Sequence, residues 1–256
     1  MKFTIDKESI LKPLQTVQGV VERRQTLPIL SNLLLSLQDE LLSVTATDME
    51  VELVAHTTIP GGVNGDITVP ARKFIDICRS LPADAVVEFE LEGEKAAVKS
   101  GRSRFSLTTL PAGEYPGSDS LTDVLTLSVE QKDLKRLFEL TQFAMAHQDV
   151  RYYLNGLLLE IGSEGLSTIA TDGHRLAMAD LAIPTTGVDE QRQIIIPRKA
   201  VGELARLLNA EDGVVGIEVS SNLVRFTLTD MQLTSKLIDG RFPDYQRVIP
   251  ELTPEG

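Results

Sequence analysis

Apolar residues recur every three or four positions in two stretches of the first half of the chain, the spacing of one face of an α-helix. The first stretch comprises Ile10, Leu11, Leu14, Val17 and Val21. It predicts an amphipathic helix with Asp6 as its cap. Pro13 lies inside the pattern, so either the helix begins late or its first turn is distorted. A second helix is predicted after a Val-Pro pair, from Arg72 to Arg79.

The second half of the chain shows the same order of helices. Ser128-Val129-Glu130-Gln131 has the pattern of a capping box. The helical face predicted after it is formed by Leu134, Leu137, Phe138 and Thr141. A fourth helix is predicted after an Ile-Pro pair, from Arg198 to Leu208.

Short apolar and β-branched runs, bounded by Gly, Asn and Asp, separate the predicted helices and are typical of strands. In the first half these runs are NLLLSLQ (32–38), LLSVTATD (41–48), VELVAHTTI (51–59), VVEFELEG (86–93), KAAVKSG (95–101) and SRFSLTTL (103–110). Two helices among many short strands in each half predict an α+β domain whose helices lie on one face of antiparallel sheet.

The two halves are related by an internal repeat. Thr47-Asp48 recurs at Thr171-Asp172. Further anchors keep the same order, with offsets between 121 and 127 residues: Asn32 and Asn155, Pro70 and Pro197, Arg104-Phe105 and Arg225-Phe226, and Tyr115-Pro116-Gly117 and Phe242-Pro243-Asp244. A unit this long is not a solenoid repeat. It predicts two tandem domains, 1–122 and 123–256, of similar architecture.

Composition sets broad limits on the class of protein. The 256 residues are 42% hydrophobic and 24% charged, as is usual for soluble globular proteins. The chain contains no apolar run of the roughly 18 residues that a membrane span requires, and its first residues lack the apolar core of a signal peptide. The single Cys78 cannot form an internal disulfide and is predicted to be a buried core thiol, which fits a reducing compartment.

The distribution of charge is more informative than its sum. The formal net charge of −12 opposes strong electrostatic binding to nucleic acid. Basic residues nevertheless gather on the predicted helices and at their starts in both halves, while acidic residues crowd elsewhere. A protein that surrounds a polyanion, rather than gripping it, suits this pattern, because weak phosphate contacts permit sliding.

Eight stretches carry a resemblance to a known family. They are MKFTI (1–5), TLPILSNLLL (26–35), TVPARKFIDICRSLP (68–82), SGRSRFSLTTLPAGEYP (100–116), AMAHQDVRYYLNG (144–156), ATDGHRLAMA (170–179), IIIPRKAV (194–201) and TSKLIDGRFPDYQRVIP (234–250). The chain resembles the bacterial DNA sliding clamp, the β subunit of the replicative DNA polymerase III holoenzyme. The resemblance runs along the whole chain and implies the DNA clamp fold, with the two repeats forming a curved arc.

The resemblance also implies a function and partners. A family member is a non-catalytic, cytoplasmic, nucleoid-associated processivity factor. It encircles double-stranded DNA and binds the polymerase α subunit, the clamp loader δ subunit and other proteins that carry a clamp-binding motif. The family has three repeats per chain and closes as a head-to-tail homodimer. This chain covers two repeats, so we expect the third domain to be absent and the fragment to be a monomer that cannot form the ring.

Three sets of residues match functional positions of the family. The partner-peptide cleft is matched by Leu154, Thr171, Gly173, His174, Arg175, Leu176, Pro243, Arg247 and Val248. DNA contacts are matched by Arg24, Arg72, Gln148, Tyr152, Tyr153, Arg198 and Lys199. The subunit interface is matched by Lys73, Arg102, Arg104 and Phe105. We expect Phe105 to be exposed in the fragment and the cleft to be incomplete without the third domain.

Three other interpretations stay open. Clamps of archaea and eukaryotes have two domains per chain in a trimeric ring and a similar length, although the motifs above are of the bacterial kind. A pseudo-symmetric adaptor without a DNA role would suit the acidic net charge. The group Asp172, His174 and Arg175 could serve a metal-dependent nuclease, but no metal-ligand spacing, nucleotide-binding loop or cofactor motif accompanies it.

Overall fold

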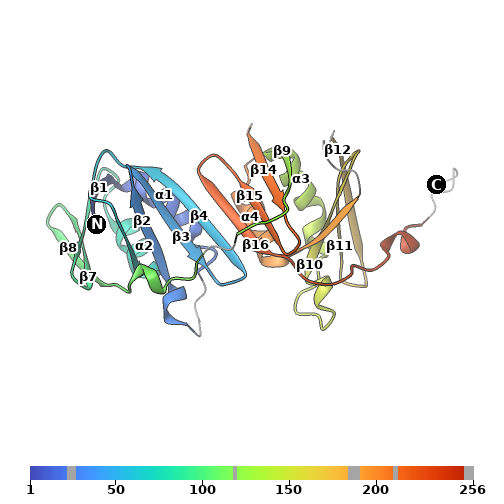
Figure 1. Ribbon diagram of the computed structural model, residues 1–256, viewed down its shortest axis with the longest axis horizontal. Helices are drawn as coiled ribbons and strands as arrows, with labels where there is room; N and C mark the ends of the chain where they lie inside the picture. The colour runs from blue at the N-terminus through green and yellow to red at the C-terminus, as the bar shows by residue number, and fades with distance from the viewer. Residues whose placement is uncertain (22–26, 118–119, 184–190, 210–212, 251–256) are drawn as a thin grey trace.

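Two repeats of the same architecture lie side by side along the long axis of the molecule (Figure 1). The structure is a computed structural model that describes residues 1–21, 27–117, 120–183, 191–209 and 213–250. The first repeat contains β1 (Lys2–Asp6), α1 (Lys7–Val17), η1 (Pro28–Ser31), β2 (Asn32–Gln38), β3 (Leu41–Thr47), β4 (Val51–Thr58), β5 (Gly65–Pro70), α2 (Ala71–Ser80), β6 (Val86–Glu92), β7 (Lys95–Ser100), β8 (Ser103–Thr108) and η2 (Ala112–Glu114).

The second repeat follows the same order. It contains β9 (Leu125–Glu130), α3 (Gln131–Thr141), η3 (Gln142–Ala144), η4 (Tyr152–Leu154), β10 (Gly156–Gly162), β11 (Gly165–Thr171), β12 (Leu176–Ala182), β13 (Arg192–Pro197), α4 (Arg198–Leu207), β14 (Val214–Val219), β15 (Leu223–Thr227), β16 (Met231–Lys236) and η5 (Tyr245–Val248). β9 corresponds to β1, β10 to β13 correspond to β2 to β5, and β14 to β16 correspond to β6 to β8. The predicted internal repeat and the α+β class are therefore confirmed.

The strands form three antiparallel sheets. Their orders are β1-β6-β7-β8, β12-β11-β10-β13 and the eight-stranded β5-β2-β3-β4-β16-β15-β14-β9. The largest sheet crosses from one repeat to the other, because β4 pairs with β16 in a register that places Leu53 opposite Leu233. Both of these side chains are buried. The two repeats therefore share one continuous sheet, and we call the β4–β16 pairing the joint.

The helices lie where they were predicted, but the predicted capping hydrogen bonds are not formed. The first helix spans Lys7–Val17 and passes through Pro13, which is buried. Asp6 occupies the N-cap position but makes no side-chain capping bond. The capping box predicted from Ser128 is wrong. Ser128 instead pairs with Gly216 inside β9, and that strand runs directly into the helix.

Four strands were not predicted from the sequence, namely β1, β5, β9 and β13. In β1 the buried residues Phe3 and Ile5 alternate with exposed ones, which is the period of a half-buried strand. Each of the four leads straight into a helix without a turn residue between them. Cys78 is buried on α2 as predicted, and burial raises the pKa of its thiol to about 12.

Helices of both repeats meet on one side of the joint. Within each repeat the two helices contact one another, α1 with α2 and α3 with α4. Across the joint, Arg206 of α4 donates to the carbonyl of Thr16 at 2.8 Å, and the Glu203 carboxylate lies against Gly19. The four helices consequently form a row in the order α2-α1-α4-α3, which we call the helix row.

The helix row is cationic although the chain is acidic. Its four helices carry eleven Lys or Arg residues against five Asp or Glu, a net charge of +6 within a chain of −12. Lys12, Arg72, Lys73, Lys132 and Arg136 are exposed along it. The prediction that positive charge concentrates on the helices of both repeats is therefore confirmed.

Two of the ion pairs that join the repeats differ in burial. Lys199 binds Asp48, whose side chain is 7% exposed, while Lys12 binds Asp230, where the two side chains are 74% and 40% exposed. Asp48 also accepts backbone N–H bonds from Glu50 and Val51, at 2.9 and 2.7 Å. Exposed pairs contribute little to stability, whereas removing one partner of a buried pair leaves a charge without compensation.

We expect Asp48→Ala to lower the free energy of unfolding by about 2 kcal/mol, because it removes three hydrogen bonds of a buried carboxylate. Asp230→Ala serves as the control and should cost no more than about 1 kcal/mol. Urea unfolding of both variants provides the measurement. Equal losses for the two variants would mean that burial of Asp48 at the joint has no energetic consequence.

Candidate functional site

The same Thr-Asp turn follows the equivalent strands β3 and β11 in the two repeats. Thr47 accepts the N–H of Met49, and Thr171 accepts the N–H of Gly173, both at 3.1 Å. Met49 and Gly173 share positive φ values of 79° and 87°. In the first repeat this turn is tied to α4 at the joint through Asp48. In the second repeat it stands at the free edge strand β12, beside a pocket.

That pocket, of about 420 Å³, is the candidate partner-peptide cleft. It is lined by Arg151, Tyr153, Leu154, Thr171, Gly173, His174, Arg175, Leu176, Pro243, Asp244, Tyr245 and Val248. Eight of the nine residues predicted for the cleft thus line one cavity. The ninth, Arg247, does not line it but forms an ion pair with Asp244, which does, at 2.7 Å.

Four lining residues were missed by the sequence prediction: Arg151, Tyr153, Asp244 and Tyr245. Each lies within three residues of one that was predicted, so proximity in sequence was the only available signal. Leu154 and Tyr245 are buried and give the cleft an apolar floor, and Val248 is 68% exposed at its mouth. An apolar floor with polar edges is the arrangement that accepts an aliphatic or aromatic anchor of a peptide.

An ion pair between Arg151 and Asp149 forms part of the polar rim of the cleft. Arg151 donates to both carboxylate oxygens of Asp149, at 3.0 and 2.8 Å, and to the carbonyl of Asp172 at 3.2 Å. Hydrogen bonds from the Arg151 side chain and backbone lower the pKa of Asp149 to about 2. The same side-chain bond raises the pKa of Arg151. The pair is therefore charged throughout the neutral pH range.

The Asp172 turn is organised by its own backbone. The N–H groups of His174 and Arg175 donate to Oδ1 of Asp172, at 2.9 and 3.1 Å, and lower the pKa of this carboxyl group. The Arg175 side chain donates to Oδ2 at 3.0 Å and lies over the Phe143 ring, 5.5 Å from its centroid. The carboxylate thus closes a turn, which argues against a role as a nuclease ligand. Within the described ranges, no group of three His, Cys, Asp or Glu side chains could hold a metal ion.

The predicted DNA contacts that the structure describes are dispersed over the helix row, the loop before η4 and η4 itself. Arg24 lies outside the described residues. Arg72 is exposed on α2, and Gln148 is exposed in a loop at a positive φ of 56°. The rings of Tyr152 and Tyr153 pack edge to face at 5.8 Å, and Tyr152 is 58% exposed.

Two of the predicted DNA contacts have structural partners instead of facing solvent alone. Arg198 donates to the carbonyls of Met145 and Ala146, at 2.9 and 3.5 Å, and so holds the loop that carries Gln148. Lys199 binds Asp48 across the joint and is 31% exposed. The partners of both residues come from elements distant in sequence, which composition and spacing do not reveal.

The residues predicted for a subunit interface gather at the other end of the molecule. Lys73 lies exposed on α2, and Arg102 and Arg104 are exposed on the β7–β8 hairpin. Arg104 donates to Glu92 at 3.3 Å. Phe105 is part-buried and packs against the main core, so the expectation that it is exposed is wrong.

None of the helices in the described part of the chain is both long and apolar enough to span a membrane.

Comparison with known proteins agrees with the fold and the site geometry. Family models for the N-terminal domain and the central domain of the DNA polymerase III beta subunit match residues 1–119 and 128–244. The beta sliding clamp of Pseudomonas aeruginosa is 53% identical over 98% of this chain and 68% of its own length. That of Escherichia coli K12 is 51% identical over the same shares.

Solved structures give the same result. A sliding clamp from Pseudomonas aeruginosa, solved with griselimycin bound, matches with a TM-score of 0.95 and 51% identity over 99% of this chain and 69% of that one. The pol III beta of Caulobacter crescentus matches with a TM-score of 0.92 and 42% identity over 98% and 69%. These matches do not favour a two-domain clamp of the trimeric type. The chain belongs to the DNA polymerase III beta subunit family, the bacterial sliding clamps.

Proposed function

We propose that this chain forms part of a ring that encircles duplex DNA and tethers the replicative polymerase, without a catalytic role of its own. Its proposed partners are duplex DNA, the polymerase α subunit, the clamp loader δ subunit and a second copy of the protein. The proposed location is the bacterial cytoplasm, at the nucleoid. The observation that carries the proposal is the joint between the repeats.

The joint supplies a rule for extending the molecule. In the first repeat, β4 ends the four strands β5-β2-β3-β4. In the second repeat, β16 ends the four strands β9-β14-β15-β16, and these two end strands pair with each other. The equivalents of these strands, β12 and β8, are edge strands of their own sheets. One repeat can therefore follow another head to tail through the same strand pairing. Head-to-tail contacts of this kind close into rings when the rotation between units allows it.

The helix row supports DNA as the content of that ring. Each added repeat would extend a row that carries a net positive charge, while most acidic residues of the chain lie elsewhere. Diffuse cationic contacts bind the phosphate backbone without reading its sequence. Such contacts permit movement along the duplex, as a tether for a moving polymerase requires.

The cleft supports the docking role. Leu154, Leu176 and Val248 line it together with the charged rim, which suits short peptides with an aliphatic or aromatic anchor. We propose that polymerase and clamp loader present such peptides to this one cleft.

Photo-crosslinking tests which face of the protein meets DNA. A Cys bearing a photoreactive group replaces Arg72 on α2 or Arg136 on α3, with Thr4 on β1 and Thr126 on β9 as exposed control positions away from the helix row. Cys78 does not compete for the label, because it is fully buried. With the protein loaded on nicked circular duplex, we expect crosslinks at 72 and 136 and only background at 4 and 126. Equal crosslinking at all four positions would contradict the proposal.

A further inference from the structure

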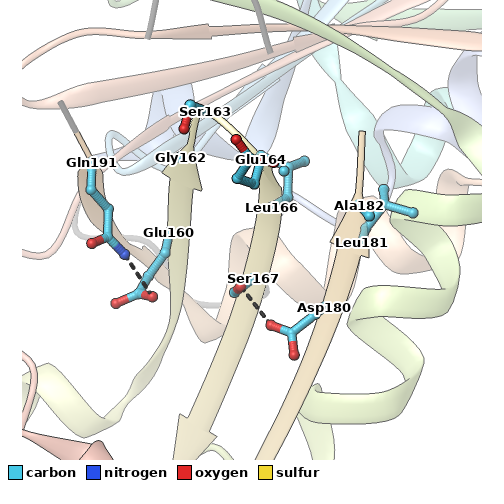
Figure 2. Close-up of a pocket in the computed structure, with 11 residues that line it drawn as sticks. Glu160, Gly162, Ser163, Glu164, Leu166, Ser167, Asp180, Leu181, Ala182 and Gln191 are labelled. Carbon is cyan, nitrogen blue, oxygen red and sulfur yellow. Dashed lines mark hydrogen bonds between the residues drawn. The ribbon is translucent and has the colours of Figure 1, made fainter. Parts of the chain in front are cut away.

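One face of the four-stranded sheet in the second repeat carries a polar row beside an apolar row. The strand register aligns Gln193, Glu160, Ser167 and Asp180 across β13, β10, β11 and β12. Two residues along, the same register aligns Ile195, Leu158, Ile169 and Met178. The apolar row lies next to the cleft, and the polar row lies beyond it. Figure 2 shows two hydrogen bonds of the polar row, from Gln191 to Glu160 and from Ser167 to Asp180.

Glu160 is an acidic residue in an unusual setting. It is only 6% exposed, and its carboxylate accepts hydrogen bonds from three neutral donors. Gln191 donates at 3.0 Å, Gln193 at 2.5 Å and the phenol of Tyr245 at 2.9 Å. A buried carboxylate is costly unless its lone pairs are satisfied, so each of these donors is held firmly in place.

Tyr245 joins the two rows. Its ring belongs to a buried cluster with Leu158, Ile169, Ile195 and Phe242, which covers the apolar row. Its hydroxyl reaches past this cluster to Glu160. Burial, followed by the hydrogen bond to Glu160, raises the pKa of Tyr245 to about 12, so the phenol remains a donor at neutral pH.

Tyr245 also lies in the segment that builds one wall of the cleft. Pro243, Asp244 and Val248 line the cavity on either side of it. This segment follows the last strand and pairs with no strand around η5. The contacts of Phe242 and Tyr245 with the sheet are therefore what fixes the wall.

We propose that Glu160 is a positioning residue for the partner-peptide cleft, acting through the Tyr245 hydroxyl to hold the segment 242–248 against the sheet. This inference rests on the proposed docking function of the cleft. Glu160 does not line the cleft and touches no peptide. It acts only through its hydrogen bond with the Tyr245 hydroxyl.

Amide hydrogen exchange of the 256-residue chain tests the anchoring directly. Tyr245→Phe removes only the hydroxyl and keeps the ring in its cluster. Losing a hydrogen bond to a charged group should speed exchange of the amides of 242–248 about tenfold. Tyr115→Phe is the matched control, since Tyr115 is also buried and its hydroxyl bonds Thr47 and Thr45 in the first repeat. That variant should leave exchange in 242–248 unchanged. Unchanged exchange in Tyr245→Phe overturns the inference.

A second experiment tests whether Glu160 acts through its hydrogen bond with Tyr245. Glu160→Leu removes the same hydrogen bond and should speed exchange of 242–248 as much as Tyr245→Phe does. The fold should persist, because an apolar residue of similar volume is commonly tolerated in place of a buried charge. The double variant should be no faster than the faster single one, since both remove the same bond. Additive effects would mean that Glu160 does not act through Tyr245.

Peptide binding separates the inference from the proposed function. Fluorescence anisotropy with a fluorescein-labelled pentapeptide ending in Leu-Phe should show about fivefold weaker binding to Tyr245→Phe and unchanged binding to Tyr115→Phe. Equal binding to the wild type and Tyr245→Phe would overturn positioning of the cleft. If the wild type does not bind the probe, the docking function fails, and the exchange data still decide whether Glu160 anchors the segment.

Discussion

Leu176→Asp is expected to weaken binding of a Leu-Phe peptide to the cleft at least about 100-fold, the loss typical of a central interface anchor. Leu176 opens β12, is part-buried and packs against the cluster under the cleft. An aspartate there would place a carboxylate beside the apolar floor, where a bound peptide would strip it of water. The Asp172 carboxylate on the adjoining turn would also repel the negative charge of the introduced aspartate. Fluorescence anisotropy with the labelled peptide measures the loss.

Met178→Asp is the matched control for this substitution. Met178 stands two residues further along the same strand and on the same face, is 39% exposed, and does not line the cleft. Both variants add one negative charge to β12, so an effect of net charge would appear in both. We expect near wild-type binding for Met178→Asp. Comparable losses in the two variants would indicate that the peptide does not bind in the cavity beside Leu176.

Local pattern predicted most of the elements but not how they begin. The helices α2 and α4 were placed within a residue at each end, because their apolar faces repeat with helical period. The capping box at Ser128 was wrong because β9 needed the same residues for pairing with β14. The strands β1 and β5 were missed because each is short and merges with the helix that follows it.

The candidate site was predictable as far as the motif resemblance reached. Leu154, Thr171, His174 and Val248 come together from three separate segments, as the resemblance implied. The roles of Lys199 and Glu160 were not predictable. The partner of Lys199 is Asp48 in the other repeat, and Glu160 meets Tyr245 from 85 positions away. Contacts of such long range depend on the assembled sheets and leave no periodic trace.

The repeat in the sequence has a direct structural meaning. Thr47-Asp48 and Thr171-Asp172 form the same turn, but one is covered by α4 at the joint and the other is open at the cleft rim. A further repeat joined to β12 as the second is joined to the first would cover that rim with its own residues. The cleft would then be completed by the neighbouring repeat, and its incompleteness in this chain stays a prediction.

Retention on DNA of different topology tests encirclement most directly. The protein that carries this chain is loaded on nicked circular duplex, isolated by gel filtration, and half of the sample is linearised by a single cut before a second filtration. Because a ring is held by topology and its phosphate contacts are weak, the protein should remain with the circles at high salt and be lost from the linear molecules. If it instead leaves circles and linear molecules alike as salt rises, it binds by electrostatic contact alone and does not encircle DNA.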